Sequence, residues 1–461
     1  MINYNLVALS YLVSSVLFIL SLKGLSHPES ARRGNTFGMI GMAMAIVTTF
    51  YLMKNQVTVN GYALTLAMIV VGGIIGTILA KKVEMTAMPQ LVAAMHSLVG
   101  LAAVLIAVAA ILKPGLHMDA VHRFELFVGA FIGAITFTAS IVAFGKLSGS
   151  FSSKAIRFSG QHWLNLVMAI AMIVAGVAYF LNENHTAFYI MLAIALVLGY
   201  LLIIPIGGAD MPVVVSMLNS YSGWAAAGIG FTLNNHLLIV AGSLVGASGA
   251  ILSYIMCRAM NRSFWNVILG GLGGDDAVAG GGEEGDKTYR AGSPEDAVFL
   301  MKNADSVIIV PGYGLAVARA QHALQELAEK LEHAGVKVRY AIHPVAGRMP
   351  GHMNVLLAEA EVPYDSVLEM EEINSDFSST DVVLVIGAND VVNPAAKDDP
   401  TSPIYGMPIL EAHRARTVLV VKRSMAAGYA GLDNDLFYMD KTMMVFGDAK
   451  KVVDEMVKAA E

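Results

Sequence analysis

The chain has 461 residues, of which 56% are hydrophobic and 14% charged, with a formal net charge of −6 and a mean hydropathy of +0.61. Soluble domains carry about 25% charged residues, and the deficit here lies before about Met260. A membrane part followed by a water-soluble part is therefore predicted. No basic tract stands out, which argues against a nucleic-acid partner. The single cysteine, Cys257, cannot form an intrachain disulfide or a cysteine metal cluster, so we interpret it as a small buried hydrophobe and expect no metal.

Nine mainly apolar segments, each near the 20 residues or so that cross a bilayer as a helix, precede the change in composition. They are predicted at 4–22, 36–53, 59–80, 90–112, 124–147, 164–181, 186–206, 212–231 and 237–260. We interpret the first as a retained helix, because it lacks the basic start and small-residue cleavage site of a signal peptide. Small residues at 71–76 and 241–247 predict close approach between helices.

Lysine and arginine are distributed unequally between the two sets of predicted loops, which indicates the orientation. One side carries Lys23, Arg32, Arg33, Lys81, Lys82, Lys146, Lys154, Arg157, Arg258 and Arg262, and the other carries Lys54, Lys113 and Arg123. We therefore expect a bacterial cytoplasmic (inner) membrane protein, in contact with lipid, with its N-terminus outside. An odd number of spans then places the C-terminal domain in the cytoplasm.

Three polar residues of the membrane part are candidates for proton translocation. His96 is the one Asp, Glu, His, Lys or Arg well inside a predicted span, and imidazole titrates near neutral pH. A neutral histidine bonded to another helix explains His96 equally well. Asn219 could orient water or bond a histidine, although a helix–helix contact is the better interpretation of it alone. Asp210 stands at a helix start on the cytoplasmic side, as an N-cap or a proton gate.

The composition predicts three parts: a transmembrane domain at 1–262, a Gly-rich acidic linker at 263–292 and a soluble domain at 293–461. The linker has the composition of a flexible tether, which permits the domains to move relative to each other. Strands are expected at 306–310, 336–342, 382–386, 417–421 and 443–446, with an amphipathic helix to about Glu332 and a last helix from about Asp448. This alternation predicts a Rossmann-like parallel sheet, with ligands at the carboxyl ends of its strands.

A Gly-x-Gly turn, Gly312-Tyr313-Gly314, follows the first of these strands. Such a turn lets a pyrophosphate approach the N-terminus of the following helix, although a single Gly-x-Gly is weak evidence. The third fingerprint position is Val317 instead of glycine or alanine, so the match is imperfect.

Two features favour NADP(H) over NAD(H). NAD sites usually have an acidic residue after the second strand, whereas here residues 339–344 contain none. Lys422, Arg423 and Ser424 follow the 417–421 strand and offer positive charge and a hydroxyl to a phosphate. An exposed basic turn is the alternative, and it is weakened by the position at a strand's carboxyl end.

Longer stretches carry a more specific signal: residues 81–85, 207–224, 343–355, 387–390 and 422–424, the last leading to 428–431. Together they resemble the beta subunit of proton-translocating NAD(P) transhydrogenase, over essentially the whole chain. The resemblance implies a Re/Si-specific transhydrogenase that couples hydride transfer between NAD(H) and NADP(H) to proton translocation. It further implies an alpha subunit that binds NAD(H), in an alpha2beta2 assembly.

The resemblance also implies residue roles. His96 and Asn219 match positions linked to proton translocation, and Asp210 matches an acid related to proton conductance. Asp390 matches an acid near the nicotinamide that couples protonation to nucleotide binding, and Tyr429 lies in a loop that covers NADP(H). The implied nucleotide, reversed across the sheet relative to ordinary Rossmann proteins, contacts Gly312, Tyr313, Gly314, Val317, Arg348, Gly387, Asn389, Asp390, Lys422, Arg423, Ser424 and Tyr429, with Lys422 to Ser424 at its 2′-phosphate.

Two other classes of protein remain as alternatives. A channel or transporter with a nucleotide-sensing domain would need a selectivity filter or a midplane site. The only Gly-Tyr-Gly, at 312–314, follows a strand of the soluble part. A structural membrane subunit whose soluble domain has lost its ligand would retain no nucleotide on purification.

Overall fold

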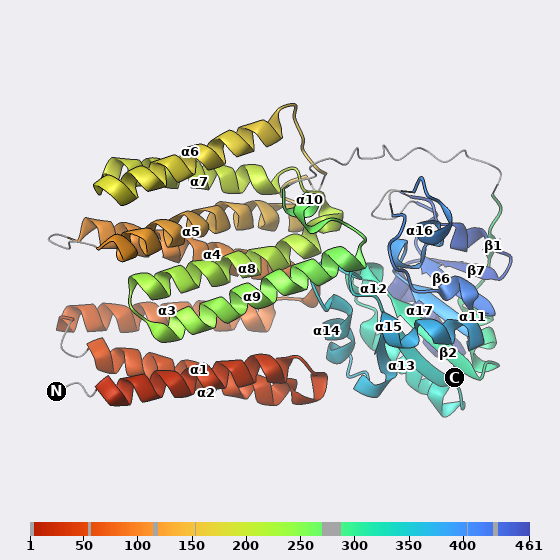
Figure 1. The fold of residues 1–461 in the computed structure, drawn as a ribbon. Helices are drawn as coiled ribbons and strands as arrows, with labels where there is room; N and C mark the ends of the chain where they lie inside the picture. The colour runs from red at the N-terminus through yellow and green to blue at the C-terminus, as the bar shows by residue number, and fades with distance from the viewer. Residues whose placement is uncertain are drawn as a thin grey trace. The chain divides into compact units, whose positions relative to one another are not determined.

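The computed structural model describes residues 4–53, 57–113, 119–152, 154–269, 287–402, 404–426 and 432–461. Its contacts divide the chain into two compact units (Figure 1). The first comprises Met1–Pro205 and Met217–Ile251, and the second Ile206–Ser216 and Leu252–Glu461. Most of the predicted Gly-rich linker, residues 270–286, lies outside the described residues, and the predicted domain boundaries stay predictions.

Long helices make up the N-terminal part of the described chain. They are α1 (Tyr4–Leu25), α2 (Pro28–Met53), α3 (Val59–Lys82), α4 (Met88–Leu112), α5 (Ala120–Leu147), α6 (Gln161–Asn182), α7 (His185–Ile203), α8 (Met211–Thr232) and α9 (His236–Ala259). Eight of them are long and apolar enough to cross a membrane, which confirms the predicted helical membrane part. The second begins earlier than predicted, so Arg32 and Arg33 belong to helix α2 rather than to a loop.

The exception among these helices is α8, which is long enough to span a bilayer but is not among the eight apolar ones. The predicted segment 212–231 is a helix, but its polar run at residues 216–224 lowers its hydropathy below that of the other eight. The same helix is heavily buried, with Leu218, Ser220 and Ala225 fully inaccessible. Its polar groups therefore face neighbouring helices, where hydrogen bonds satisfy them, instead of lipid.

Glycines bring α8 into backbone contact with two neighbours. A Cβ added to Gly223 would lie 2.3 Å from the backbone nitrogen of Gly246 on α9. A Cβ on Gly228 would lie 2.6 Å from the Cα of Gly129 on α5. The predicted close packing of residues 241–247 is thus confirmed. At 71–76 the prediction was wrong within this chain, because α3 has no buried residue and Gly72, Gly73 and Gly76 have open space beside them.

We expect Gly223→Ala to lower the stability of the helical part by about 1–3 kcal/mol, since the added methyl group meets backbone that cannot rotate away. Gly73→Ala is the matched control on α3, where the added methyl contacts nothing and alanine favours the helix. The melting temperature of each purified variant in detergent checks this. Equal melting temperatures for the two variants would show that the α8–α9 contact is not tight.

The C-terminal part contains a parallel seven-stranded sheet with the order β1-β7-β6-β5-β2-β3-β4, which confirms the predicted fold class. Its strands are β1 (Arg290–Ala291), β2 (Ser306–Pro311), β3 (Lys337–Ile342), β4 (Val367–Glu369), β5 (Val382–Ile386), β6 (Thr417–Lys422) and β7 (Thr442–Phe446). The order β4-β3-β2-β5-β6-β7 is that of the Rossmann fold, in which the order of successive strands reverses between β2 and β5 although these strands are parallel. The prediction lacked β1 and β4, because two or three residues carry no periodic signal.

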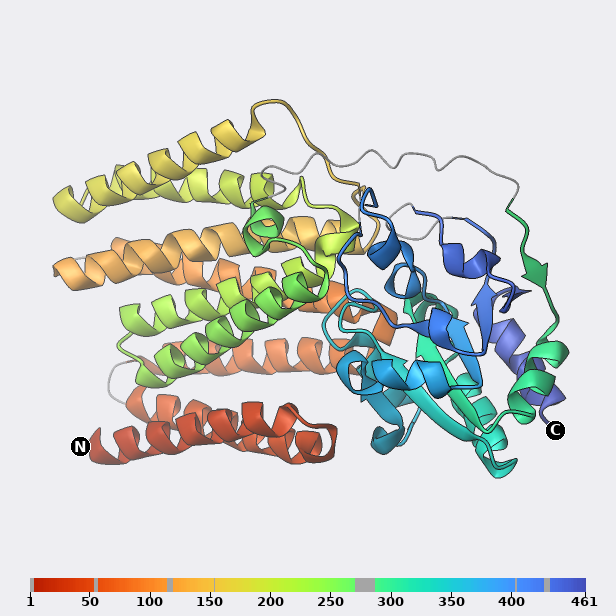
Figure 2. The ribbon, with the colours of Figure 1, turned by 45° about the vertical axis from the view of Figure 1, so that its right-hand side comes forward.

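Helices cover both faces of this sheet (Figure 2). They are α11 (Pro294–Lys302), α12 (Tyr313–Ala318), α13 (Gln321–His333), α14 (His352–Glu359), α15 (Met370–Ile373), α16 (Ala395–Asp398) and α17 (Ala449–Ala459), with a short α10 (Phe264–Ile268) before them. The first predicted helix is broken after α12, where Arg319 adopts a left-handed φ of 53°. The inner positions of the central strands are apolar because both faces of the sheet are buried, as in Val307 to Val310 at 0% exposure.

Candidate functional site

The membrane candidate His96 lies on α4 and contacts α8. Its Nδ1 is 2.9 Å from the hydroxyl oxygen of Ser222, and that oxygen is 2.8 Å from the backbone carbonyl oxygen of Asn219. Near this pair, helix α4 also packs closely on α5 at a glycine. A Cβ on Gly100, one turn after His96 on α4, would lie 2.6 Å from the Gly133 carbonyl oxygen on α5. The histidine is thus held by a closely packed group of helices.

The hydroxyl of Ser222 has one proton to donate, and this limits the state of the ring. The Ser222 hydroxyl donates this proton in its hydrogen bond to the Asn219 carbonyl. The oxygen of Ser222 can then only accept from the ring, so the neutral imidazole donates from Nδ1 to it. Its Nε2 then carries a lone pair. That atom is buried and has no hydrogen-bond partner among the described residues. The arrangement leaves one basic nitrogen available to take a proton.

The other two membrane candidates, Asn219 and Asp210, have different contacts. The hydrogen bond to His96 comes from the Ser222 hydroxyl and not from the Asn219 side chain. Asn219 takes part only through its backbone carbonyl, which accepts from Ser222. Asp210 ends a short 3-10 turn, Gly208–Asp210, directly before α8. Its carboxylate lies 3.5 Å from the Arg262 guanidinium, so it pairs with a cation after α9.

In the sheet part, backbone contacts join the two glycine loops at the reversal point. Gly312 N–H donates to the Ile386 carbonyl, and Gly314 N–H donates to the Gly387 carbonyl, both at 2.9 Å. Gly387 has φ +71°, and a Cβ there would lie 2.2 Å from the backbone nitrogen of Leu315. The N–H of Gly314 is therefore committed to protein, which differs from the expected use of this turn for a pyrophosphate.

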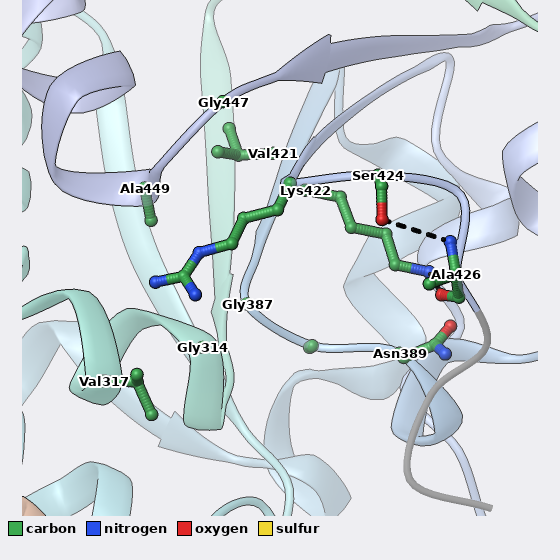
Figure 3. Close-up of a pocket in the computed structure, with 12 residues that line it drawn as sticks. Gly314, Val317, Gly387, Asn389, Val421, Lys422, Ser424, Ala426, Gly447 and Ala449 are labelled. Atoms are coloured by element: carbon green, nitrogen blue, oxygen red, sulfur yellow. Dashed lines mark hydrogen bonds between the residues drawn. The ribbon is translucent and has the colours of Figure 1, made fainter. Parts of the chain in front are cut away.

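A cavity of about 320 Å³ opens beside these loops, over the carboxyl ends of β5, β6 and β7. Predicted residues that line it are Gly314, Val317, Gly387, Asn389, Lys422, Arg423 and Ser424, and the further lining residues are Ala388, Val421, Ala426, Gly447 and Ala449. Figure 3 shows Lys422, Ser424 and Asn389 on one side of the pocket, and Val317 and Ala449 on the other. The structure thus joins seven predicted residues from three loops.

The Lys422 ammonium provides positive charge at the lining of this pocket. It donates to the Ala426 carbonyl at 2.6 Å and lies 4.6 Å from the centre of the Phe437 ring. Burial lowers the pKa of Lys422, while the nearby carboxylates of Asp390 and Asp433 act in the opposite direction. Asp390 is therefore electrostatically coupled to the pocket, although it does not line it.

Three other predicted residues lie apart from the lining. Tyr313 begins α12 and stacks with Arg348, whose guanidinium carbon is 4.4 Å from the ring centre. Arg348 follows β3, on the opposite side of β2 from the pocket strands, which is why neither residue lines the cavity. Gly312 is outside the lining because it packs on Ala388. Tyr429 lies outside the described residues.

Five lining residues were missed by the sequence interpretation, and two of them, Gly447 and Ala449, come from the turn after β7. Strand β7 is followed by a glycine and then by the start of a helix. The same pattern identified Gly312 and Gly314 after β2. The signal was therefore present, because the last strand and the helix from Asp448 were both predicted.

Two buried histidines support the loop after β3. His343 donates from Nε2 to the Pro408 carbonyl at 2.8 Å, and its Nδ1 accepts from the Val345 N–H. His352 accepts the Arg348 N–H on Nδ1 at 3.0 Å. Burial lowers the pKa of His343 to about 4, and burial together with the Arg348 charge lowers the pKa of His352 to about 4. Both rings are neutral at physiological pH.

We expect the sheet domain to lose stability as pH falls from about 6.5 to about 4. In this interval His343 and His352 bind protons in the unfolded chain but stay neutral in the folded one, because burial lowers their pKa. For His343 the loss is roughly 3 kcal/mol. Protection factors for β3 and β5 amides, from hydrogen exchange of the full chain, should fall across this interval. In His343→Gln the fall should be smaller, and in His322→Gln, at an exposed position of α13, it should match the parent. An identical pH dependence in all three chains would refute this assignment.

Comparison with known proteins gives concordant matches. A family model described as NAD(P) transhydrogenase beta subunit matches residues 7–459. Two relatives described as NAD(P) transhydrogenase subunit beta come from Rhodospirillum rubrum and from a designated strain of that species. Each is 60% identical to this chain over 465 aligned positions, covering 99% of both sequences.

Proposed function

Because this chain belongs to the NAD(P) transhydrogenase beta subunit family, we propose that it is the NADP(H)-binding, proton-translocating subunit of a Re/Si-specific transhydrogenase. Its partner is an alpha subunit that supplies the NAD(H) site, in an alpha2beta2 assembly. The assembly lies in the bacterial inner membrane, with the N-terminus outside and the sheet domain in the cytoplasm. Alone, the chain binds NADP(H) but does not complete the reaction.

The observation that carries this proposal is the pocket over β5 to β7. Lys422, Arg423 and Ser424 bring two cations and a hydroxyl to the lining of the pocket, and this set suits a phosphate monoester. The loop after β3 has no acidic residue from His343 to Gly351 to bind a ribose 2′-hydroxyl. Both features favour a nucleotide that carries a 2′-phosphate.

The same geometry supports a reversed nucleotide. The phosphate-binding residues lie beyond β5, whereas the Gly-x-Gly turn gives its Gly314 N–H to Gly387. We place the 2′-phosphate at Lys422 to Ser424, and assign Tyr313 and Arg348, on the β3 side, to a more distant part of the dinucleotide. Asn389 has an amide Nδ2 that is buried without a partner among the described residues, and we assign it to the nucleotide as well.

Coupling to protons is needed on energetic grounds. When bound, the nicotinamides of NADH and NADP⁺ exchange a hydride at nearly equal potentials, so the exchange itself sets no direction. Moving one charge through 100 mV supplies about 2.3 kcal/mol, so about 200 mV biases the equilibrium by roughly three decades. Proton passage must therefore alter nucleotide binding between two states of the protein.

We assign the membrane end of this coupling to His96. Its Nε2 is a buried basic atom without a partner among the described residues, and Ser222 holds the ring through Nδ1. Protonation at Nε2 changes the charge inside the helix group, and this change biases the nucleotide site between open and closed forms.

The purified full chain should bind NADP⁺ more tightly than NAD⁺ in calorimetric titrations. Arg423→Gln should weaken NADP⁺ binding about 10- to 100-fold, since a charge-assisted hydrogen bond is lost, and should leave NAD⁺ binding nearly unchanged. Arg416→Gln is the matched control, because Arg416 pairs with Asp381 at the other end of β6 and is 81% exposed. Equal affinities for the two nucleotides would exclude the assigned 2′-phosphate site.

With an alpha subunit in proteoliposomes, we expect His96→Gln to abolish proton uptake and to make hydride exchange insensitive to an imposed proton gradient. The amide keeps a polar side chain but cannot take up a proton. Dye quenching measures proton uptake, and a reduced nucleotide analogue reports hydride exchange. His185→Gln, at an exposed position at the start of α7, should remain coupled. Full gradient dependence in His96→Gln would remove His96 from the mechanism.

A further inference from the structure

The carboxylate of Asp448 lies beside the pocket and contacts one of its basic lining residues. Its Oδ2 is 3.0 Å from Nη2 of Arg423. Both neighbours of Asp448 in the sequence, Gly447 and Ala449, line the cavity, as does Arg423 itself. The guanidinium that faces the pocket is therefore already paired with an anion supplied by the protein.

The sheet brings the two residues together. Strands β6 and β7 are parallel neighbours, with Lys422 opposite Phe446 in the register. The residues that follow the two strands, Arg423 and Gly447-Asp448, therefore leave the same edge of the sheet side by side. Gly447 N–H donates to the Lys422 carbonyl at 3.0 Å, which fixes the two turns to each other.

The two carboxylate oxygens of Asp448 serve different partners. Oδ1 accepts the backbone N–H of Lys450 at 3.2 Å and so caps α17, a helix of 11 residues. Oδ2 pairs with Arg423. An N-cap needs only an oxygen acceptor, and serine or asparagine caps a helix as well as aspartate does. The negative charge is therefore not required by the helix.

We propose that Asp448 sets nucleotide affinity and specificity by competing with the 2′-phosphate of NADP(H) for Arg423. This inference rests on the proposed function of the pocket. A phosphate that reaches Arg423 displaces the carboxylate and remains close to its charge, so the phosphate binds more weakly than an unopposed guanidinium would allow. A nucleotide with a 2′-hydroxyl leaves the ion pair intact. The carboxylate thus weakens the binding of NADP(H) but not that of NAD(H), and this favours release of NADP(H).

Calorimetric titration of the purified full chain with NADP⁺ and NAD⁺ at fixed ionic strength tests this. Asp448→Asn keeps the cap and removes the charge. NADP⁺ should bind about three- to five-fold more tightly, in keeping with a pair whose side chains are 65% and 37% exposed, while NAD⁺ affinity stays constant. Asp448→Ser, which also caps, should behave in the same way. Glu455→Gln, which removes one exposed charge from the second turn of α17, should change neither affinity.

The outcomes separate this inference from the proposed function. If the parent chain shows no preference for NADP⁺, the 2′-phosphate site and the role of Asp448 are both wrong. If the parent prefers NADP⁺ but Asp448→Asn binds it equally or more weakly, only the competition is wrong, and the carboxylate instead orients Arg423. An equal gain for NADP⁺ and NAD⁺ would also overturn it. In the Arg423→Gln background, the gain from Asp448→Asn should fall below two-fold.

Discussion

Backbone contact between the loops after β2 and β5 determines where a ligand can lie in the sheet domain. The loops exchange hydrogen bonds from Gly312 and Gly314 to Ile386 and Gly387, and a Cβ on Gly312 would lie 2.3 Å from the Gly387 carbonyl oxygen. This contact takes up the N–H groups of Gly312 and Gly314 at the reversal point, where many Rossmann proteins bind a ligand. Space remains beyond β5, where the loops after β6 and β7 supply basic groups and a helix start. The Rossmann strand order is thus combined with a cavity that extends towards β6 and β7.

The membrane part depends on a related constraint, the close approach of helix backbones at glycines. Polar α8 is stable in this setting because its hydroxyls find acceptors on other helices, as with Ser220 and the Gly246 carbonyl at 2.6 Å. Close packing also brings Ser222 to His96. Helix packing and the placement of a titratable ring therefore have one cause, and a change that separates the helices would disturb both.

The fold could be predicted to a large extent from the sequence, because hydropathy reveals membrane helices and alternating apolar strands reveal a parallel sheet. Lys422 to Ser424 could be located because they directly follow a strong strand. Sequence could not reveal that Gly314 turns its N–H towards Gly387, since that depends on a loop some 70 residues away. The sequence offered a bond from the Asn219 amide to a histidine only as a possibility, and it did not identify Ser222, which the helix rotation brings to His96. The glycines of α3 predicted a helix contact that is absent among the described residues of this chain. A run of small residues permits close packing but does not specify which helix packs there.

The opposite directions of the Lys422 and Arg423 side chains limit insertions and deletions in strand β6. Lys422 turns towards Ala426 and Phe437, while the next residue, Arg423, turns towards Asp448. Residues 418–421 of β6 are all apolar and buried, so losing or gaining one codon would still present apolar groups to both faces of the sheet. The same change would reverse the two cations. The length of this strand is thus set by where Lys422 and Arg423 must point, since apolar packing in the interior does not fix it.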